Sequence, residues 1–499
     1  MSKLTFSLLF CLLICSQISV AQKNEIDKRL KGLDTLVARV MKDWHVAGLA
    51  VAVVEKDKVI YLKGFGYRDY ENKLPVTPNT VFSIASCTKA MTAGLIGILA
   101  EENKIDINRP VRNYFPALEF YNEQLSSYVT IKDMLAHRTG LPRHDWLTHS
   151  KQDIPIDSIV YRIRFLEPSA GFREKFQYCN LMYTALGGFV QKVTGKSWEQ
   201  SMKEKILDPL GMRNTTCLIS DLKNAVEYSK GYTVRNDTII PGKMSNSGAN
   251  PAGSINSSVN DMAQWLIALI HEGKYRDKQV IPARFIREAT SPQVSNPSRP
   301  RPGLPAYPDI YFGDYGYGWN LCSYRGHYLA THGGDLPLFS STTALYPTDS
   351  IGIVVLVNKF DATISEIIRD YIADKLLTLP FKDWNKELLA LYQRNNSGNK
   401  PAPAPEITVV PLSHPLTDYT GIYIHPAYGK VQVTLSNDTL RAAHNDEPIL
   451  FRHYNYDIFR AGVPGGRLRF QMNKEGRIIS MAAALEPEVK DIVFVKSNY

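Results

Sequence analysis

Strand-like sequence lies near both ends of the first 380 residues, and helical sequence fills the interval between them. Residues 48–67, GLAVAVVEKDKVIYLKGFGY, have the pattern of two strands around a polar turn. Strand-like runs return at 328–331, 342–346 and 351–357. Helical patterns occupy 25–43, 85–101, 131–137, 181–194, 258–272 and 361–378. This distribution predicts an α/β (α+β) fold in which one antiparallel sheet, built from both ends of the segment, carries a helical cluster.

The first 21 residues have the features of a cleaved export signal. Lys3 is followed by an apolar run at 4–15, and Ser19-Val20-Ala21 is a small-residue cleavage site. The apolar run is too short to span a bilayer. We therefore expect residues 1–21 to be a signal peptide, the mature protein to be periplasmic or extracellular, and no stable membrane span.

The composition of the chain changes after residue 380. Residues 394–405, RNNSGNKPAPAP, are polar and rich in proline, as in an extended linker. Beyond them, short alternating runs such as KVQVTL and DIVFVK are separated by turn residues. We predict a large domain at 22–380, a linker at 381–411 and a small antiparallel β-barrel-like domain at 412–499.

The composition argues against several classes of function. The net charge of +9 comes from basic residues that are spread among acidic ones, so we expect no nucleic-acid binding. No pair of cysteines has CxxC spacing, and no phosphate loop or dinucleotide fingerprint is present, so we expect neither a metal nor a cofactor. His137 is expected to be a buried, hydrogen-bonded histidine. The sequence leaves open whether any of the cysteines outside the signal peptide form a disulfide: Cys87, Cys179, Cys217 and Cys322.

Three Ser-x-x-Lys stretches occur, and their surroundings distinguish them. The stretch at 397–400 lies in the linker, and the stretch at 220–223 lies in polar sequence typical of a helix cap. Ser86 instead follows apolar residues and opens the helical pattern at 85–101, which places Lys89 one turn along the same face. A lysine among apolar neighbours can lose its proton and accept one from the serine. A serine cap with a solvated lysine is the structural alternative.

Two further segments contain residues suited to catalysis. Tyr178-Cys179-Asn180 precedes a run of small and apolar residues. A tyrosine near a lysine cation can have a lowered pKa and transfer protons, and the amide of Asn180 can hold a substrate carbonyl. The alternative is a packed tyrosine with a capping asparagine.

The second segment is Thr331-His332-Gly333-Gly334-Asp335, which lies between strand-like runs. Two glycines weaken a strand unless something approaches its backbone closely, and a substrate lying along the strand would do so. The N–H groups of Ser86 and Asp335 could then form an oxyanion hole. A plain hairpin turn is the alternative.

Together the three motifs have the order and separations of a known family. The chain resembles the serine β-lactamases and penicillin-binding proteins, particularly the branch of class C β-lactamases, D-alanyl-D-alanine carboxypeptidases and esterases. His332-Gly333-Gly334 falls where many relatives have Lys-Thr-Gly and several esterase-like members have His. The resemblance covers about residues 25–378, and similar stretches also lie at 130–142, 206–216, 251–266 and 315–319. The segment at 412–499 resembles a small β-barrel domain that follows the hydrolase domain in some members; its partner is unknown.

The resemblance implies a β-lactamase/transpeptidase-like fold and an exported serine hydrolase that forms an acyl-serine. Ser86 would attack the carbonyl while Lys89 and Tyr178 take its proton as a coupled pair. The implied substrate-binding residues are Asn180, His332, Gly333, Gly334 and Asp335. Expected substrates are small molecules or peptides, including cell-wall-derived ones: peptides of D-amino acids, esters or β-lactam-like compounds.

His332 makes efficient β-lactam hydrolysis a weaker expectation. An imidazole has a reference pKa near 6.5, so it holds a substrate carboxylate less firmly than a lysine does. Leu338, where relatives commonly have Gly, is expected to narrow the same cleft. The alternative function is a weakly active or inactive penicillin-binding sensor protein of the cell envelope.

Overall fold

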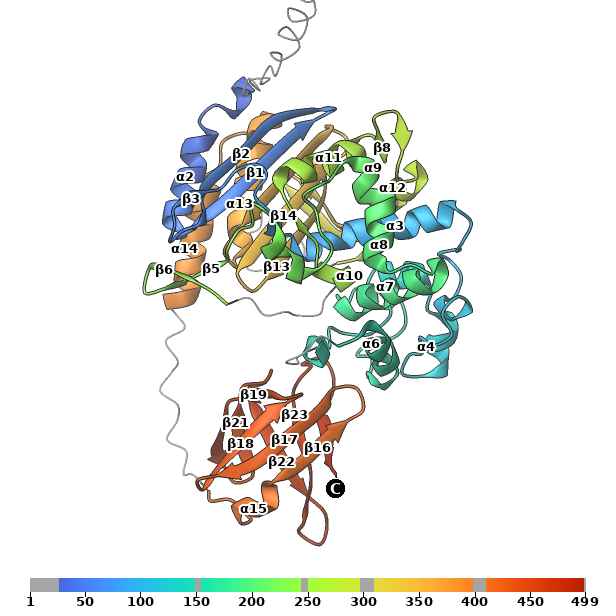
Figure 1. Cartoon of the computed structure of the whole chain (residues 1–499), viewed down its shortest axis with the longest axis vertical. Coiled ribbons are helices and arrows are strands. Elements are labelled where there is room, and N and C mark those ends of the chain that lie inside the picture. Colours follow the sequence, from blue (N-terminus) through green and yellow to red (C-terminus); the bar gives the residue numbers. More distant parts are fainter. Residues whose placement is uncertain (1–26, 149–153, 244–249, 297–308, 398–409, 498–499) are drawn as a thin grey trace, which may run out of the picture.

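The computed structural model of the protein describes residues 27–148, 154–243, 250–296, 309–397 and 410–497 (Figure 1). The predicted signal peptide at 1–21 and the Pro-rich residues 398–405 lie outside these ranges. None of the helices in the described ranges is both long enough and apolar enough to cross a bilayer.

The large domain contains a sheet in which nine described strands are paired antiparallel. In spatial order they are β10 (Val294–Ser295), β11 (Ile310–Tyr315), β12 (Asn320–Tyr324), β13 (His327–Leu336), β14 (Phe339–Tyr346), β15 (Ile351–Val357), β1 (Gly48–Glu55), β2 (Lys58–Asp69) and β3 (Leu74–Pro75). β1 pairs with β15, with Val51 opposite Val355, so the two ends of the domain meet inside the sheet as predicted.

Both faces of this sheet are covered by helices, which explains the unbroken apolar run in β1. Val51 and Val53 pack with α2 (Leu33–Asp43) and α13 (Ala362–Leu376) on one face. Ala50 and Ala52 belong to the core on the other face. Because successive strand residues point to opposite faces, both sets of side chains must be apolar.

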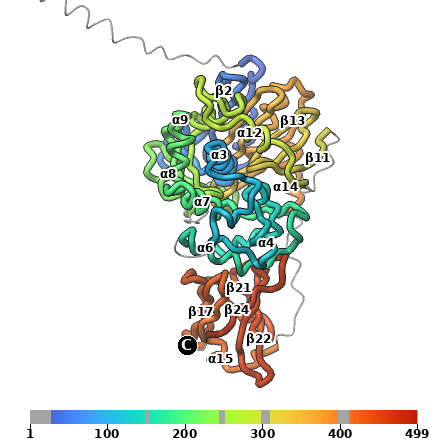
Figure 2. The backbone as a smooth tube through the Cα atoms, turned by 90° about the vertical axis from the view of Figure 1, so that its right-hand side faces the viewer, coloured from blue at the N-terminus to red at the C-terminus, as the bar shows by residue number. Residues whose placement is uncertain are grey.

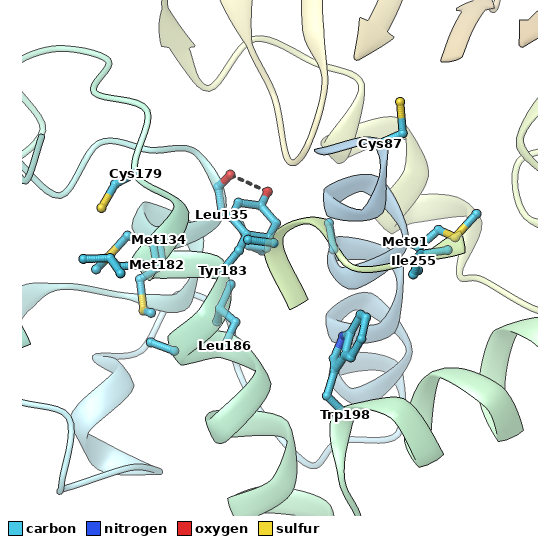
Figure 3. Close-up of a cluster of buried hydrophobic side chains, with 14 of the residues drawn as sticks. Cys87, Met91, Met134, Leu135, Cys179, Met182, Tyr183, Leu186, Trp198 and Ile255 are labelled. Atoms are coloured by element: carbon cyan, nitrogen blue, oxygen red, sulfur yellow. Dashed lines mark hydrogen bonds between the residues drawn. The ribbon is translucent and has the colours of Figure 1, made fainter. Parts of the chain in front are cut away.

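The helical cluster surrounds α3 (Thr88–Glu101), which lies in the middle of the large domain in Figure 2. Every residue of α3 from Thr88 to Leu99 is buried. The other helices of the cluster are α4 (Glu123–Tyr128), α5 (Ile131–Leu135), α6 (Ile156–Arg162), α7 (Asn180–Thr194), α8 (Trp198–Met202), α9 (Asp208–Leu210), α10 (Asn250–Gly253), α11 (Val259–Ile270) and α12 (Ala283–Ala289). Figure 3 shows Tyr183 of α7 donating its hydroxyl hydrogen to the carbonyl of Leu135, at 2.9 Å, which holds α7 beside α5.

Residues 384–397, which fall within the segment predicted as a linker, form α14 (Trp384–Ser397). Trp384 is buried and donates its indole N–H to Asp374 of α13 at 2.7 Å. Leu388 packs in the same core as α2 and α13. The helix therefore belongs to the packing of the large domain.

A second sheet forms the C-terminal domain. Its described strands are, in spatial order, β19 (Glu447–Ile449), β18 (Thr439–His444), β17 (Gly429–Ser436), β16 (Gly421–His425), β24 (Ile492–Lys496), β23 (Ile478–Ala483), β22 (Arg467–Met472), β21 (Ile458–Ala461) and β20 (Phe451–Asn455). The sheet curls into a nearly closed antiparallel barrel, preceded by the short helix α15 (Leu416–Tyr419). The predicted fold class is confirmed: a mixed helix-and-sheet domain with a small all-β domain.

Candidate active site

Ser86 lies in a tight turn at the start of the central helix. The turn η2 (Ala85–Cys87) joins β4 (Phe82–Ser83) to α3, and β4 is paired with β7 (Asn256–Ser257). Ala85 has a φ of 46°, in the left-handed region that residues with a Cβ rarely adopt. Strained backbone of this kind persists where surrounding structure enforces it, and it clusters at functional sites.

Lys89 is the only lysine within hydrogen-bonding reach of Ser86 among the described residues. Its Nζ lies 3.1 Å from Ser86 Oγ and donates to the carbonyl of Ala252 at 2.7 Å. The side chain is completely buried. Burial, with a smaller contribution from the positive charge of Arg143, lowers the pKa of Lys89 from 10.5 to about 7. A large fraction of Lys89 is therefore neutral at neutral pH and able to accept a proton.

Tyr178 approaches Ser86 from the other side. Its hydroxyl lies 3.0 Å from Ser86 Oγ, and its ring centre lies 4.9 Å from Lys89 Nζ. Burial raises the pKa of Tyr178 above its ordinary value, although the hydrogen bond to Ser86 and the charge of Arg143 act in the opposite direction. The expectation of a lowered pKa was wrong, because desolvation of the phenolate outweighs the nearby positive charge. Tyr178 is a neutral phenol, which suits a proton donor.

His137 holds the Tyr178 segment in place. Its carbonyl accepts the N–H of Gln177 at 2.8 Å, and its Nδ1 accepts the N–H of Cys179 at 3.2 Å. The imidazole is fully buried, and its ring centre lies 4.5 Å from that of Tyr178. Burial holds the pKa of His137 well below its ordinary value, so the ring is neutral. The predicted buried, hydrogen-bonded histidine is confirmed.

Asn180 lies in a polar chain beside Tyr178. Its amide donates to Asp145 at 3.0 Å, and Asp145 also accepts from Arg143 at 2.6 Å. The Arg143 guanidinium lies 5.1 Å from the Tyr178 ring centre. Asn180 therefore orients Asp145 and Arg143. It is absent from the residues that line the pocket described below.

Strand β13 runs past the nucleophile, and its two glycines face opposite ways. A Cβ on Gly334 would lie 2.2 Å from the carbonyl oxygen of Ile84 and 2.9 Å from the backbone nitrogen of Ser86. A Cβ on Gly333 would meet nothing nearer than 3.8 Å, and Gly333 lines the pocket. Position 334 therefore requires glycine because the turn that carries Ser86 lies directly against it. Gly333 faces the substrate side and leaves room there.

His332 lines the pocket with both ring nitrogens engaged. Its Nδ1 lies 2.6 Å from the carbonyl of Gly333 and its Nε2 lies 3.0 Å from the hydroxyl of Tyr315. A carbonyl only accepts, so Nδ1 carries the hydrogen. With its hydrogen on Nδ1, His332 accepts the hydroxyl hydrogen of Tyr315 at Nε2, so Nε2 can donate to a substrate carboxylate only in the protonated ring.

A pocket of about 340 Å³ opens over Ser86. It is lined by Ser86, Arg143, Phe176, Tyr178, Asn296, Asn320, His332, Gly333, Asp335, Ala362 and Glu366. Sequence reasoning missed the lining residues Arg143 and Glu366. Arg143 directly follows the family-like stretch 130–142, which was the available signal. No sequence pattern pointed to Glu366, because it lies on α13, whose sequence indicates only an amphipathic helix.

Leu338 and the four described cysteines lie outside the pocket lining. The side chain of Leu338 packs against Gly231 and Gly242, so closely that a Cβ on either glycine would collide with it. Leu338 does not line the pocket. Cys87 is buried, donates to the carbonyl of His332 at 3.1 Å and does not line the pocket. The four described cysteines are free, and no group of His, Cys, Asp or Glu among the described residues could hold a metal ion.

The fold and the arrangement of this site are those of the β-lactamase-fold family of serine hydrolases. The sequence matches the β-lactamase family over residues 33–377, and the chain belongs to that family. Its members are serine hydrolases that act on amides and esters. Residues 406–496 match a domain of unknown function, DUF3471.

Among curated proteins, the chain is 28% identical over 477 residues to an unguisins hydrolase of Aspergillus violaceofuscus, covering 86% of this chain and 82% of the relative. It is 28% identical over 333 residues to Protein flp of Staphylococcus aureus, covering 65% of this chain and 62% of that protein.

Solved structures share the fold at lower identity. The octameric penicillin-binding protein homologue from Pyrococcus abyssi aligns with a TM-score of 0.61 and 23% identity, over 94% of this chain and 99% of its own. The D-amino acid amidase from Ochrobactrum anthropi aligns with a TM-score of 0.55 and 20% identity, over 73% of this chain and 100% of its own.

Proposed function

We propose that this protein is an exported serine hydrolase that cleaves an amide or ester through an acyl-serine at Ser86. The observation that carries the proposal is the pairing of Ser86 Oγ with a buried lysine at 3.1 Å and a neutral tyrosine at 3.0 Å. A binding or sensor protein has no need for a desolvated amine whose pKa is lowered to about 7. Export rests on the signal-like residues 1–21.

The two partners of Ser86 have separate roles in the first step. Neutral Lys89 accepts the hydroxyl proton as Ser86 Oγ bonds to the substrate carbonyl carbon. The resulting oxyanion is held by the N–H groups of Ser86 and Asp335, where β13 passes the turn closely enough to require Gly334. Tyr178 then gives its proton to the departing nitrogen or oxygen as the bond between that atom and the carbonyl carbon breaks and the carbonyl re-forms. The proton on Lys89 restores the phenol, and water releases the acyl group.

The substrate class follows from the polar groups of the pocket. The hydroxyl of Tyr315 already contacts Nε2 of His332, and an imidazole is not a permanent cation, so this residue is a weaker partner for a β-lactam carboxylate than a lysine would be. Among the described residues that line the pocket, Arg143 is the one with a permanent positive charge. We infer that esters, and amides without a carboxylate beside the scissile bond, are better substrates than β-lactams. The relationship to an unguisins hydrolase supports a hydrolytic function.

The test is a probe and substrate panel on the full mature chain. A fluorophosphonate should label wild type and fail to label Ser86→Ala. The panel contains short-chain p-nitrophenyl esters, D-Ala-D-Ala peptides and a chromogenic cephalosporin, and the esters should turn over faster than the two substrates that carry a carboxylate. Absence of labelling in wild type would favour the weakly active sensor instead, and labelling that survives Ser86→Ala would rule out this nucleophile.

A further inference from the structure

One end of the C-terminal β-domain packs against the two segments that carry Arg143 and Tyr178. The contacts come from the turn between β16 and β17, from the end of β18 and from the loop between β23 and β24. Trp146, in the turn η4 (Asp145–Thr148), stacks on His444 with ring centres 5.6 Å apart. In Figure 2 the β-domain lies directly beyond α4 and α6, on the side of the large domain where these segments run.

The segment with Arg143 is held by a buried carboxylate. Glu486 is 4% exposed and accepts the backbone N–H of His144 at 2.7 Å. The His144 ring is also buried: Nε2 bonds the carbonyl of Glu167 at 3.0 Å and Nδ1 bonds the hydroxyl of Tyr428 at 2.8 Å. A buried carboxylate is costly unless it is hydrogen-bonded, so the bond from the N–H of His144 offsets the cost of burying Glu486 in the docked arrangement.

The segment with Tyr178 is held by a second carboxylate in the same loop. Glu488 accepts from the side chain of Gln177 at 3.0 Å, from Lys175 at 3.0 Å and from Ser169 at 3.2 Å. Gln177 is buried and directly precedes Tyr178. The backbone of Gln177 is fixed by His137 and its side chain by Glu488, so the two domains share the placement of the tyrosine.

We propose that the C-terminal β-domain, for which no function is assigned, is a positioning element for the active site. Glu488 sets Tyr178 through Gln177, and Glu486 sets Arg143 through His144. Proton transfer depends steeply on geometry, because a misplacement of about 1 Å can cost about a hundredfold in rate. The inference rests on the proposed function, since it gives Tyr178 and Arg143 their tasks.

The test uses full-length variants and the fastest ester of the panel. Glu488→Ala should lower kcat about tenfold with KM within about twofold, because Tyr178 acts in the chemical step. Glu488→Gln keeps an oxygen for the Gln177 amide and should recover most of the loss. The side chain of Glu488 is 47% exposed, so the alanine variant should fold. Glu475→Ala, in the exposed turn at the opposite end of β23, is the matched control.

The variant Glu486→Ala tests the placement of Arg143 independently of the placement of Tyr178. It should raise the pH midpoint of fluorophosphonate labelling, because a displaced Arg143 no longer lowers the pKa of Lys89. A purely structural role would lower the melting temperature and leave kcat and the midpoint unchanged. The inference is overturned if Glu488→Ala matches wild type or if Glu488→Gln is no better than alanine. An unlabelled wild type would instead defeat the proposed function.

Discussion

The pH dependence of Ser86 acylation tests whether Lys89 is the base. Lowering the pKa of Lys89 from 10.5 to about 7 makes the neutral amine about three thousand times more abundant at low pH than for an ordinary lysine. The second-order rate of fluorophosphonate labelling should rise about tenfold per pH unit below 7 and level off above it. His137 and Tyr178 do not account for this midpoint, because their pKa values are shifted away from neutrality in opposite directions.

Removal of the neighbouring charges should move that midpoint by a predictable amount. Arg143 and Lys89 lie 5.1 Å and 4.9 Å from the same Tyr178 ring centre, so their charges are no more than 10.0 Å apart. At this largest separation and an effective dielectric constant of about 20, the charges repel by about 1.7 kcal/mol, a little over one pKa unit, and a shorter separation gives a larger repulsion. The Arg143 side chain is 53% exposed, and solvent screening reduces the expected shift to about half a unit.

Arg143→Gln should therefore raise the midpoint by about half a pH unit. Asp145→Asn should lower it, because the carboxylate of Asp145 stabilises the charged form of Lys89. Arg143→Lys keeps the charge and serves as the control. The assignment of Lys89 as base fails if the wild-type midpoint lies near 10, or if Arg143→Gln and Asp145→Asn shift it in the same direction.

The remaining predictions concern individual side chains of the site. Tyr178→Phe should lower kcat about a hundredfold in steady-state ester assays, because the leaving group loses its acid. Lys89→Met should abolish turnover, because the base is lost. It should nevertheless raise the free energy of unfolding at pH 7 by about 2 kcal/mol. Burying the amine costs about 4 kcal/mol, and its hydrogen bonds offset part of that cost. In chemical denaturation this gain should shrink as pH rises from 7 toward 10.5, where the unfolded lysine loses its charge. Gly334→Ala should destabilise the fold, because its Cβ would lie 2.2 Å from the Ile84 carbonyl oxygen, whereas Gly333→Ala should melt like wild type in thermal scans.

Much of the fold was predictable because its signals are local. The continuous apolar runs of β1 and β15, and the helical pattern that became α3, are patterns of a few residues that follow from burial. The linker prediction at 381–411 overlapped α14, because the contacts of Trp384 with α13 are distant in sequence and give no local pattern.

In the candidate site, too, the local motifs could be predicted and the properties that depend on tertiary contacts could not. Ser86, Lys89 and Tyr178 were singled out by motif order, and their catalytic roles stay predictions until the variants are measured. The direction of the Tyr178 pKa shift could not be read from the sequence, because desolvation depends on residues that surround the ring in space.

The sequence by itself determined the order of elements, the candidate nucleophile and its lysine, because helix and strand periods and the Ser-x-x-Lys spacing are short-range properties of the chain. Only the tertiary structure decided how those groups are tuned. Arg143 reaches Tyr178 across a loop, Gly334 faces the turn of Ser86, and Glu486 and Glu488 approach from more than 300 residues away. Burial and charge act through space, so the protonation and placement of catalytic groups emerge only when distant segments pack together.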